Sequence, residues 1–291
     1  MNDVQVHALY ESLARFQWWR ARRRVADDSL EGLEMRKRLA PSVDGEGPAD
    51  GGPGLDSWLR AFIGGVEGAR VVDVGCGFGA TALRAVDAGA SRCSGFTPSA
   101  YMVACARRVA AARGVGARCH FEVAKIGQPL PPADVVIAVE SMGHTGDLRS
   151  ALSSVAAACR EGRSGRFLWL EDLLAEPAAE DPDVRALGRA WSSPALRSIA
   201  EADDALSSAG LAVIRSYDLS EQVVTRDIVS VDRSRRALSL LRKVTPVPVV
   251  RRVLAAFLGG AFLERLYARR MVRYRLVVAA PVEDVADAAG C

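Results

Sequence analysis

Residues 71–79 constrain this chain more than any others, because a short apolar run there leads directly into three glycines, Gly75, Gly77 and Gly79. Successive apolar residues suit a parallel strand that is covered on both faces of its sheet. Glycine has no Cβ atom, so it can adopt positive φ and lets a ligand approach the backbone amides closely. The pattern predicts a strand, a ligand-binding glycine turn and a helix over residues 80–87. A glycine-rich turn without a ligand is the alternative.

The spacing of the glycines distinguishes between the ligands that use such a turn. A dinucleotide fingerprint has the spacing Gly-x-Gly-x-x-Gly and an acid about 20 residues further on, at the end of the second strand. This chain has Gly-x-Gly-x-Gly, and Thr97 follows the predicted second strand at 92–96. A phosphate loop would need Gly-Lys-Ser/Thr, which the sequence lacks. With Asp73 two residues ahead of Gly75, the run resembles motif I of the class I S-adenosylmethionine-dependent methyltransferases.

Composition limits the class of protein. With 291 residues, of which 49% are hydrophobic, the chain can form one large domain or a domain with a cap. Its net charge of +3 does not indicate a nucleic-acid partner, and no apolar run reaches the roughly 18 residues of a membrane span. The amino-terminal residues lack the apolar core of a signal peptide, so we expect a cytoplasmic protein. Six cysteines without a Cys-x-x-Cys pair predict reduced thiols and no metal site.

Strands and helices alternate along the middle of the chain, which predicts an α/β fold with a parallel sheet. We expect strands at residues 70–74, 92–96, 118–123, 134–139, 166–170, 211–217 and 272–280. We expect helices at residues 55–63, 79–88, 99–113 and 147–160. The resemblance implies a Rossmann-like, seven-stranded, mostly parallel sheet with helices on both faces, in which the last strand is antiparallel.

Segments outside this core predict a lid. Residues 1–54 are expected to form an N-terminal helical lid, with an amphipathic helix from about residue 7 to 24, and a Gly/Pro-rich linker at 41–54. The same helix could instead be an oligomer contact that joins two copies of the chain, or an ordinary core-capping helix.

The methyltransferase core is expected to span residues 55–281, with a tail at 282–291. Two helical cap insertions are predicted inside it, at 175–199 and at 219–270, and the second includes an apolar helix near 248–267. Such insertions lie above the carboxyl ends of the strands, where open α/β sheets bind ligands. They are therefore the expected walls of a substrate pocket.

The resemblance implies S-adenosyl-L-methionine as the cofactor. Asp73 would orient its methionine part, although an Asx turn would explain the same residue. Thr97 stands where many members have the acid that binds the ribose, and Ser99 could be only the N-cap of the next helix. Lys125 and Ile126 stand where the family often has Asp-Ala, and a lysine cannot accept the hydrogen bond of the adenine amino group. The expected cofactor-binding residues are Asp73, Gly75, Cys76, Gly77, Gly79, Thr97, Pro98, Met102, Lys125, Ile126 and Glu140.

A second motif, Glu140-Ser-Met-Gly-His144, follows the predicted strand at 134–139. It resembles a Glu-Ser-x-x-His segment of a subgroup that acts on lipids, tocopherols, sterols, isoprenoids and glycosylated natural products. Glu140 and His144 are the expected catalytic residues, because a neutral imidazole or a carboxylate can take a proton from an attacking hydroxyl. Glu140 could instead only hold the amino group of the cofactor, and His144 could only cap a turn. The expected substrate-binding residues are Tyr10, Trp18, Trp19, Glu171, Trp191 and Phe262.

These residues predict methyl transfer to a largely apolar small molecule in bacterial specialised metabolism, with C-methylation of an isoprenoid as the sharper version. The arginine-rich, lysine-poor composition suggests a high-GC bacterium. O- or N-methylation of a polyketide, sugar or aromatic amine is a second interpretation, and a non-methylating protein that keeps the fold is a third. Arginines that could bind a diphosphate, or form only a solvated helix face, are Arg233, Arg235, Arg236, Arg242, Arg251 and Arg252.

Overall fold

The computed structural model describes residues 3–23, 26–30, 32–33, 37, 39, 66–193 and 196–283. The predicted linker at 41–54 and the predicted helix at 55–63 lie outside the described residues. The strands are β1 (Arg70–Val74), β2 (Arg92–Thr97), β3 (Cys119–Val123), β4 (Val135–Val139), β5 (Arg166–Leu174), β6 (Leu211–Asp218) and β7 (Val272–Pro281). The helices are α1 (Asp3–Arg22), α3 (Ala80–Asp87), α4 (Ala100–Ala112), α5 (Leu148–Arg160), α6 (Pro182–Trp191), α7 (Ile199–Ser208), α8 (Ile228–Val244) and α9 (Pro248–Ala268), with 3-10 turns η1 (Met142–His144) and η2 (Ser220–Gln222).

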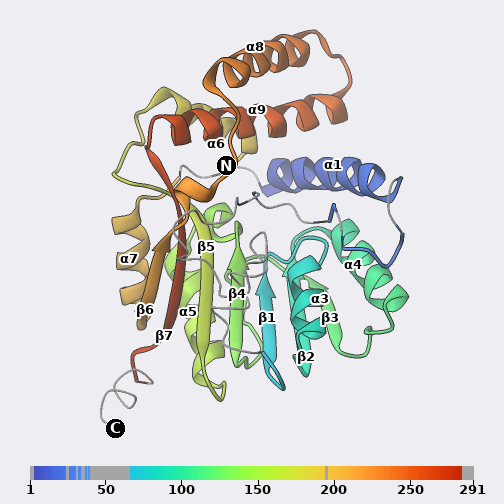
Figure 1. Cartoon of the computed structure of the whole chain (residues 1–291), viewed down its shortest axis with the longest axis vertical. Coiled ribbons are helices and arrows are strands. Elements are labelled where there is room, and N and C mark those ends of the chain that lie inside the picture. The colour runs from blue at the N-terminus through green and yellow to red at the C-terminus, as the bar shows by residue number, and fades with distance from the viewer. Residues whose placement is uncertain are drawn as a thin grey trace.

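The strands form a single seven-stranded sheet in the order β3-β2-β1-β4-β5-β7-β6 (Figure 1). Strands β1 to β5 are parallel to their neighbours, whereas β7 runs antiparallel to both β5 and β6. The predicted Rossmann-like, mostly parallel sheet with an antiparallel last strand is therefore confirmed. The order reverses between β1 and β4, which is the place where open α/β sheets bind ligands.

Helices cover both faces of the sheet because its strands are apolar on both sides. Val71 and Ile137 belong to the core that α3 and α4 cover. Val72 and Val136, one position along each strand, belong to the core that α5 and α7 cover. Alternate residues of a strand point to opposite faces, so the continuous apolar runs of β1 and β4 serve two cores at once.

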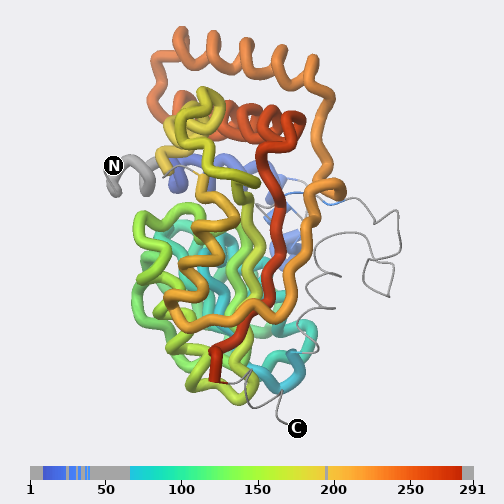
Figure 2. Tube along the Cα trace, turned by 90° about the vertical axis from the view of Figure 1, so that its left-hand side faces the viewer, coloured from blue at the N-terminus to red at the C-terminus, as the bar shows by residue number. Residues whose placement is uncertain are grey.

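Helices α1, α6, α8 and α9 lie over the carboxyl ends of the parallel strands (Figure 1). Helices α6 and α9 share an apolar cluster, and α8 packs on the outer side of α9 (Figure 2). Helix α1 contacts both α9 and α4, and its Phe16 ring meets Phe257 of α9 edge to face with 6.0 Å between ring centroids. Leu9 and Ala14 of α1 are buried within the same chain. The lid, the oligomer contact and the core-capping helix all stay predictions.

The fifth strand is longer than predicted. It was expected to end at residue 170, but β5 continues to Leu174 because β7 pairs with it from Phe167 to Leu174. Glu171 and Asp172 are consequently buried strand residues, and they are consecutive, so their side chains leave opposite faces of the sheet.

Candidate active site

The glycine turn after β1 is tightly packed at its two ends and open in the middle. All three glycines have positive φ, between 53° and 79°. A Cβ atom on Gly75 would lie 2.2 Å from Ser141 Cβ, and one on Gly79 would lie 2.7 Å from the Phe121 ring, whereas one on Gly77 would meet no atom within 4 Å. A ligand can therefore approach the backbone at Gly77, which suits the predicted role of the turn.

The end of β2 lies beside this turn. The amides of Gly75 and Cys76 both donate to the Phe96 carbonyl oxygen, at 2.8 and 2.9 Å. The Cys76 side chain is buried, so at most the backbone of that residue can face a ligand. Asp73, in β1, is also buried, with 2% of its surface exposed.

Polar side chains gather at the end of β2, namely those of Thr97, Ser99 and Glu11. The Thr97 hydroxyl is buried and directed at the sulfur of Met102, 3.9 Å away. Ser99 caps α4, as the alternative interpretation holds, since its Oγ accepts from the Met102 amide at 3.1 Å. The Ser99 hydroxyl in turn donates to Glu11 Oε1 at 2.5 Å. Helix α1 thus brings a carboxylate to a strand end that has none of its own, which sequence reasoning missed because residue 11 is remote in the chain.

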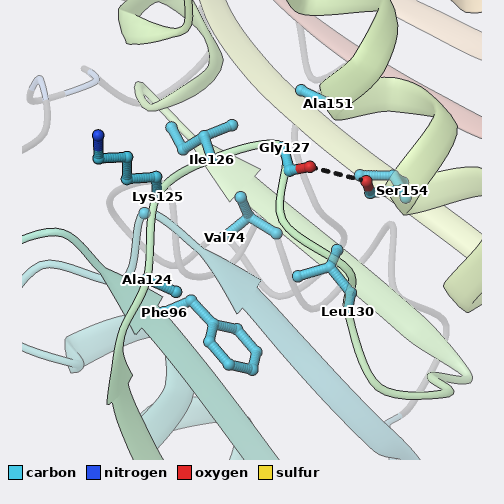
Figure 3. A pocket seen from close by; sticks show the side chains of 11 residues that line it. Val74, Phe96, Ala124, Lys125, Ile126, Gly127, Leu130, Ala151 and Ser154 are labelled. Atoms are coloured by element: carbon cyan, nitrogen blue, oxygen red, sulfur yellow. Dashed lines mark hydrogen bonds between the residues drawn. The ribbon is translucent and has the colours of Figure 1, made fainter.

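A small pocket joins the turn to the loop after β3 (Figure 3). Ile126, which was expected to pack on an adenine ring, lines it together with Val74 and Phe96. The Lys125 side chain is directed away from Val74 (Figure 3). The lining residues are Val74, Gly75, Phe96, Ala124, Lys125, Ile126, Gly127, Leu130, Ala151, Ser154 and Val155.

Glu140 ends β4 in a strained conformation. Its φ of 48° lies in the left-handed region, which costs a residue other than glycine about 1–3 kcal/mol. Its Oε1 accepts from the Tyr274 hydroxyl at 2.7 Å and from the Lys37 amide at 2.9 Å. These two hydrogen bonds fix the position of the Glu140 side chain.

Lys37 is the main site residue that the sequence did not reveal. Its ammonium forms an ion pair with Asp172 and lies 3.4 Å from Glu140 Oε1, and its side chain is 15% exposed. The Tyr267 hydroxyl donates to the other oxygen of Asp172 at 2.5 Å. Burial disfavours the ammonium, but the charges of Asp172 and Glu140 outweigh it and raise the pKa of Lys37. A possible signal was its rarity, since the chain has only three lysines.

His144 lies in η1, directly after β4, and contacts the lid. The Tyr10 hydroxyl of α1 lies 2.8 Å from Nε2 and 3.0 Å from Nδ1 of the imidazole. The Trp191 ring is 6.5 Å from the imidazole, centroid to centroid. Burial lowers the pKa of His144 to about 4, so the imidazole is neutral at physiological pH.

Glu171 lies on the same side of the sheet as the η1 turn. The Gly143 amide donates to its Oε2 at 2.9 Å. Burial, with the nearby charge of Asp172, raises the pKa of Glu171 to about 8, so the carboxyl group is largely protonated at neutral pH. The site therefore holds a neutral histidine and a largely neutral carboxylic acid beside the ion pair of Lys37 with Asp172, and Glu140 also contacts that lysine.

The structure brings some of the predicted substrate-binding residues to His144 and leaves others apart. The Tyr10 hydroxyl lies within hydrogen-bonding distance of the imidazole, and the Trp191 ring lies near it. Glu171 accepts a hydrogen bond from the amide of Gly143, the residue before His144. Trp18 instead packs on Phe78 of the glycine turn, with ring centroids 5.8 Å apart.

Trp19 and Phe262 lie outside this group. Trp19 is 53% exposed, with the guanidinium of Arg23 over its ring. Phe262 packs in the cap cluster of α6 and α9, with Arg235 of α8 5.9 Å from its ring centroid. These two positions were read from their aromatic character alone, which does not distinguish a pocket wall from a packed or exposed helix face.

Part of the chain is similar to known methyltransferases. Residues 71–162 match the family described as a methyltransferase domain. An O-methyltransferase of Pyrenophora dematioidea is 31% identical over 160 residues, which are 54% of this chain and 59% of that protein. The O-methyltransferase cnsE of Penicillium expansum is 29% identical over 161 residues, 54% of this chain and 57% of that protein. The chain thus spans less than two thirds of the length of these curated relatives, which are fungal.

Solved structures share the whole architecture. Geranyl diphosphate C-methyltransferase from Streptomyces coelicolor A3(2) has a TM-score of 0.65 at 17% identity, covering 94% of this chain and 98% of that one. The [4+2]-cyclase SpnF has a TM-score of 0.62 at 19% identity, covering 86% and 88%. Likeness at this identity concerns the fold alone. Residues 71–162 therefore match a methyltransferase domain, and the surrounding chain has a fold that a solved methyltransferase shares.

Proposed function

We propose that this chain transfers a methyl group from S-adenosyl-L-methionine to a hydroxyl oxygen of a largely apolar small molecule. The observation that carries this proposal is His144, a partly buried, neutral imidazole at the carboxyl end of β4 that lies 2.8 Å from the Tyr10 hydroxyl. A neutral imidazole can accept the proton that a hydroxyl loses when its oxygen is methylated. The names of the two fungal relatives, both O-methyltransferases, point to the same class of reaction.

The residues present fit the cofactor. Gly77 leaves the backbone open, Ile126 and Phe96 line an apolar pocket beside it, and Glu11 supplies a carboxylate next to Ser99. When bound, S-adenosylmethionine supplies a methyl group already activated on a sulfonium. The chain then has to align the acceptor and exclude water. Overall, the acceptor O–H bond breaks, an O–CH₃ bond forms, the sulfonium becomes a thioether, and the proton passes to an imidazole nitrogen of His144.

The charge of the site favours an uncharged acceptor over a diphosphate. Lys37 contacts both Glu140 and Asp172, so its ammonium is already paired with carboxyl groups and is not free to bind a phosphate group. Carboxyl groups at the site are also poor partners for an anionic acceptor. The arginines considered for a diphosphate lie on the outer cap helices, where Arg233, Arg236 and Arg242 are exposed. We therefore rank O-methylation above C-methylation of a prenyl diphosphate. C-methylation stays the second candidate because the fold is similar to that of a geranyl diphosphate C-methyltransferase.

The proposed function is tested by incubating the chain with trideuteromethyl-labelled cofactor and separate acceptors. The panel consists of an apolar phenol, an aliphatic alcohol, an aromatic amine, and geranyl diphosphate with and without Mg²⁺. Mass spectrometry is expected to find the label on oxygen in the phenol or the alcohol. Label only on the amine, or only on geranyl diphosphate, would overturn the proposal. Cofactor binding with no transfer to any member would instead favour a non-methylating protein, an activity class that the fold of SpnF accommodates.

The proposal also includes the organism of origin and the kind of metabolism in which the protein acts. The scarcity of lysine beside abundant arginine supports a bacterial origin and specialised metabolism. The Trp191 ring, 6.5 Å from the imidazole of His144, supports an acceptor that is largely hydrophobic.

A further inference from the structure

The hairpin formed by α8 and α9 exposes a dense group of apolar side chains at its tip, defined here as residues 240–252. Helices α8 and α9 are antiparallel neighbours joined by a short turn, and α8 forms the layer farthest from the sheet (Figure 2). Single exposed apolar residues are ordinary, but a contiguous group usually marks a surface that contacts something. The exposed fractions at the tip are 63% for Leu240, 50% for Leu241, 66% for Val244, 50% for Val247, 50% for Val249 and 44% for Val250.

The same tip is strongly basic. Residues 240–252 contain four arginines or lysines and neither an aspartate nor a glutamate. Arg242, Lys243 and Arg251 are exposed and flank the apolar side chains. The acidic partners of the hairpin lie at its opposite end, where Asp232 and Glu264 pair with arginines. The cations of the tip are therefore not balanced by acids on their own hairpin.

We propose that this tip docks on the surface of an anionic lipid bilayer. Apolar side chains flanked by lysine and arginine are the combination that interfacial segments use, since the apolar groups enter the boundary of the acyl chains while the cations meet anionic headgroups. The contact is superficial, because no helix of the described part is long and apolar enough to cross a membrane. A second copy of the chain is a poorer occupant, because two such tips would bring like charges together.

Docking there would place the acceptor site close to a reservoir of apolar molecules. Helix α9 runs from the tip to the wall of the site, where its Ala256 carbonyl accepts from Trp191 Nε1 at 2.9 Å. This consequence rests on the proposed function, whereas the docking itself does not.

The proposal is tested by sedimenting the full chain with large vesicles of phosphatidylcholine, alone or with a third of the lipid as phosphatidylglycerol. We expect binding to the anionic vesicles that weakens as salt is raised. Replacing Arg242 and Lys243 with glutamine should reduce the partition coefficient by roughly tenfold to thirtyfold. Leu241→Ser with Val244→Ser should also reduce it. All four positions are exposed, so circular dichroism should find the fold unchanged.

A matched control removes two exposed cations at the other end of the sheet, Arg92→Gln with Arg166→Gln, and should leave the partition within twofold of the wild type. The proposal is overturned if the chain does not bind vesicles of either composition. It is also overturned if the two control substitutions weaken binding as much as the two substitutions at the tip do. It is equally overturned if ultracentrifugation finds a dimer of the wild-type chain and a monomer of the Val244→Ser variant, since the tip would then be a self-association surface. None of these readouts depends on methyl transfer, so failure of the proposed function would leave them interpretable.

Discussion

Replacing Lys37 with methionine is expected to lower the free energy of unfolding by about 3–5 kcal/mol. The substitution keeps the length and apolar stem of the side chain but removes the ammonium that faces Asp172 and Glu140. Both carboxylates would then be left in a site where Lys37 is 15% and Asp172 5% exposed. Urea unfolding at pH 7 measures the change.

Two comparisons make this expectation specific. Arg108 pairs with Asp27 on the surface, where the side chains are 62% and 52% exposed, so Arg108→Met should cost less than about 1 kcal/mol. Adding Asp172→Asn to the Lys37→Met variant should recover part of the loss, because one uncompensated charge is then removed. A loss below 1 kcal/mol for Lys37→Met would mean that the buried cluster is not held by this ion pair.

Replacing His144 with glutamine is expected to lower kcat/KM for an O-methyl acceptor by roughly 10²–10⁴-fold, because the group that accepts the proton is lost. Glutamine can still hydrogen bond with Tyr10, so the lid contact is kept in part. Affinity for S-adenosylhomocysteine should stay within twofold. The matched control is His120→Gln, since His120 lies on β3, half exposed, paired with Glu122.

The pH dependence tests the same assignment. Because the pKa of His144 is lowered to about 4, its neutral form persists well below the ordinary histidine value of about 6.5. The wild-type kcat/KM should therefore stay flat between pH 7 and pH 5 and fall only as pH approaches 4. A tenfold fall between pH 7 and pH 5.5 would contradict the assignment of a partly buried, neutral imidazole as the base.

The core of the fold could be predicted because its signals are local. The apolar runs of β1 and β4, the glycines between β1 and α3, and the serine that caps α4 each act within a few residues. The motif at Glu140 and His144 was predicted for the same reason, since both residues follow β4 directly. Strand β5 was placed too short because its extension depends on pairing with β7, which is about 100 residues away in the chain.

The rest of the site could not be predicted, because it depends on contacts between remote segments. Lys37 meets Glu140 and Asp172 across more than 100 residues of sequence, and Tyr274 reaches Glu140 from the last strand. Glu11 reaches Ser99 only because α1 crosses the strand ends. A lone lysine, tyrosine or glutamate carries no local pattern that distinguishes such a role from that of a solvated side chain.

The central claim, that the glycine turn holds S-adenosylmethionine, is tested most directly by calorimetry with S-adenosylhomocysteine. We expect saturable heat at one site per chain and none with NAD⁺, because Thr97 stands in place of the acid that a dinucleotide requires. Gly77→Leu, which places a side chain where no protein atom lies within 4 Å, should abolish that heat while the protein stays folded. Absence of heat with the wild-type chain at high micromolar ligand, or undiminished heat with Gly77→Leu, would contradict the claim.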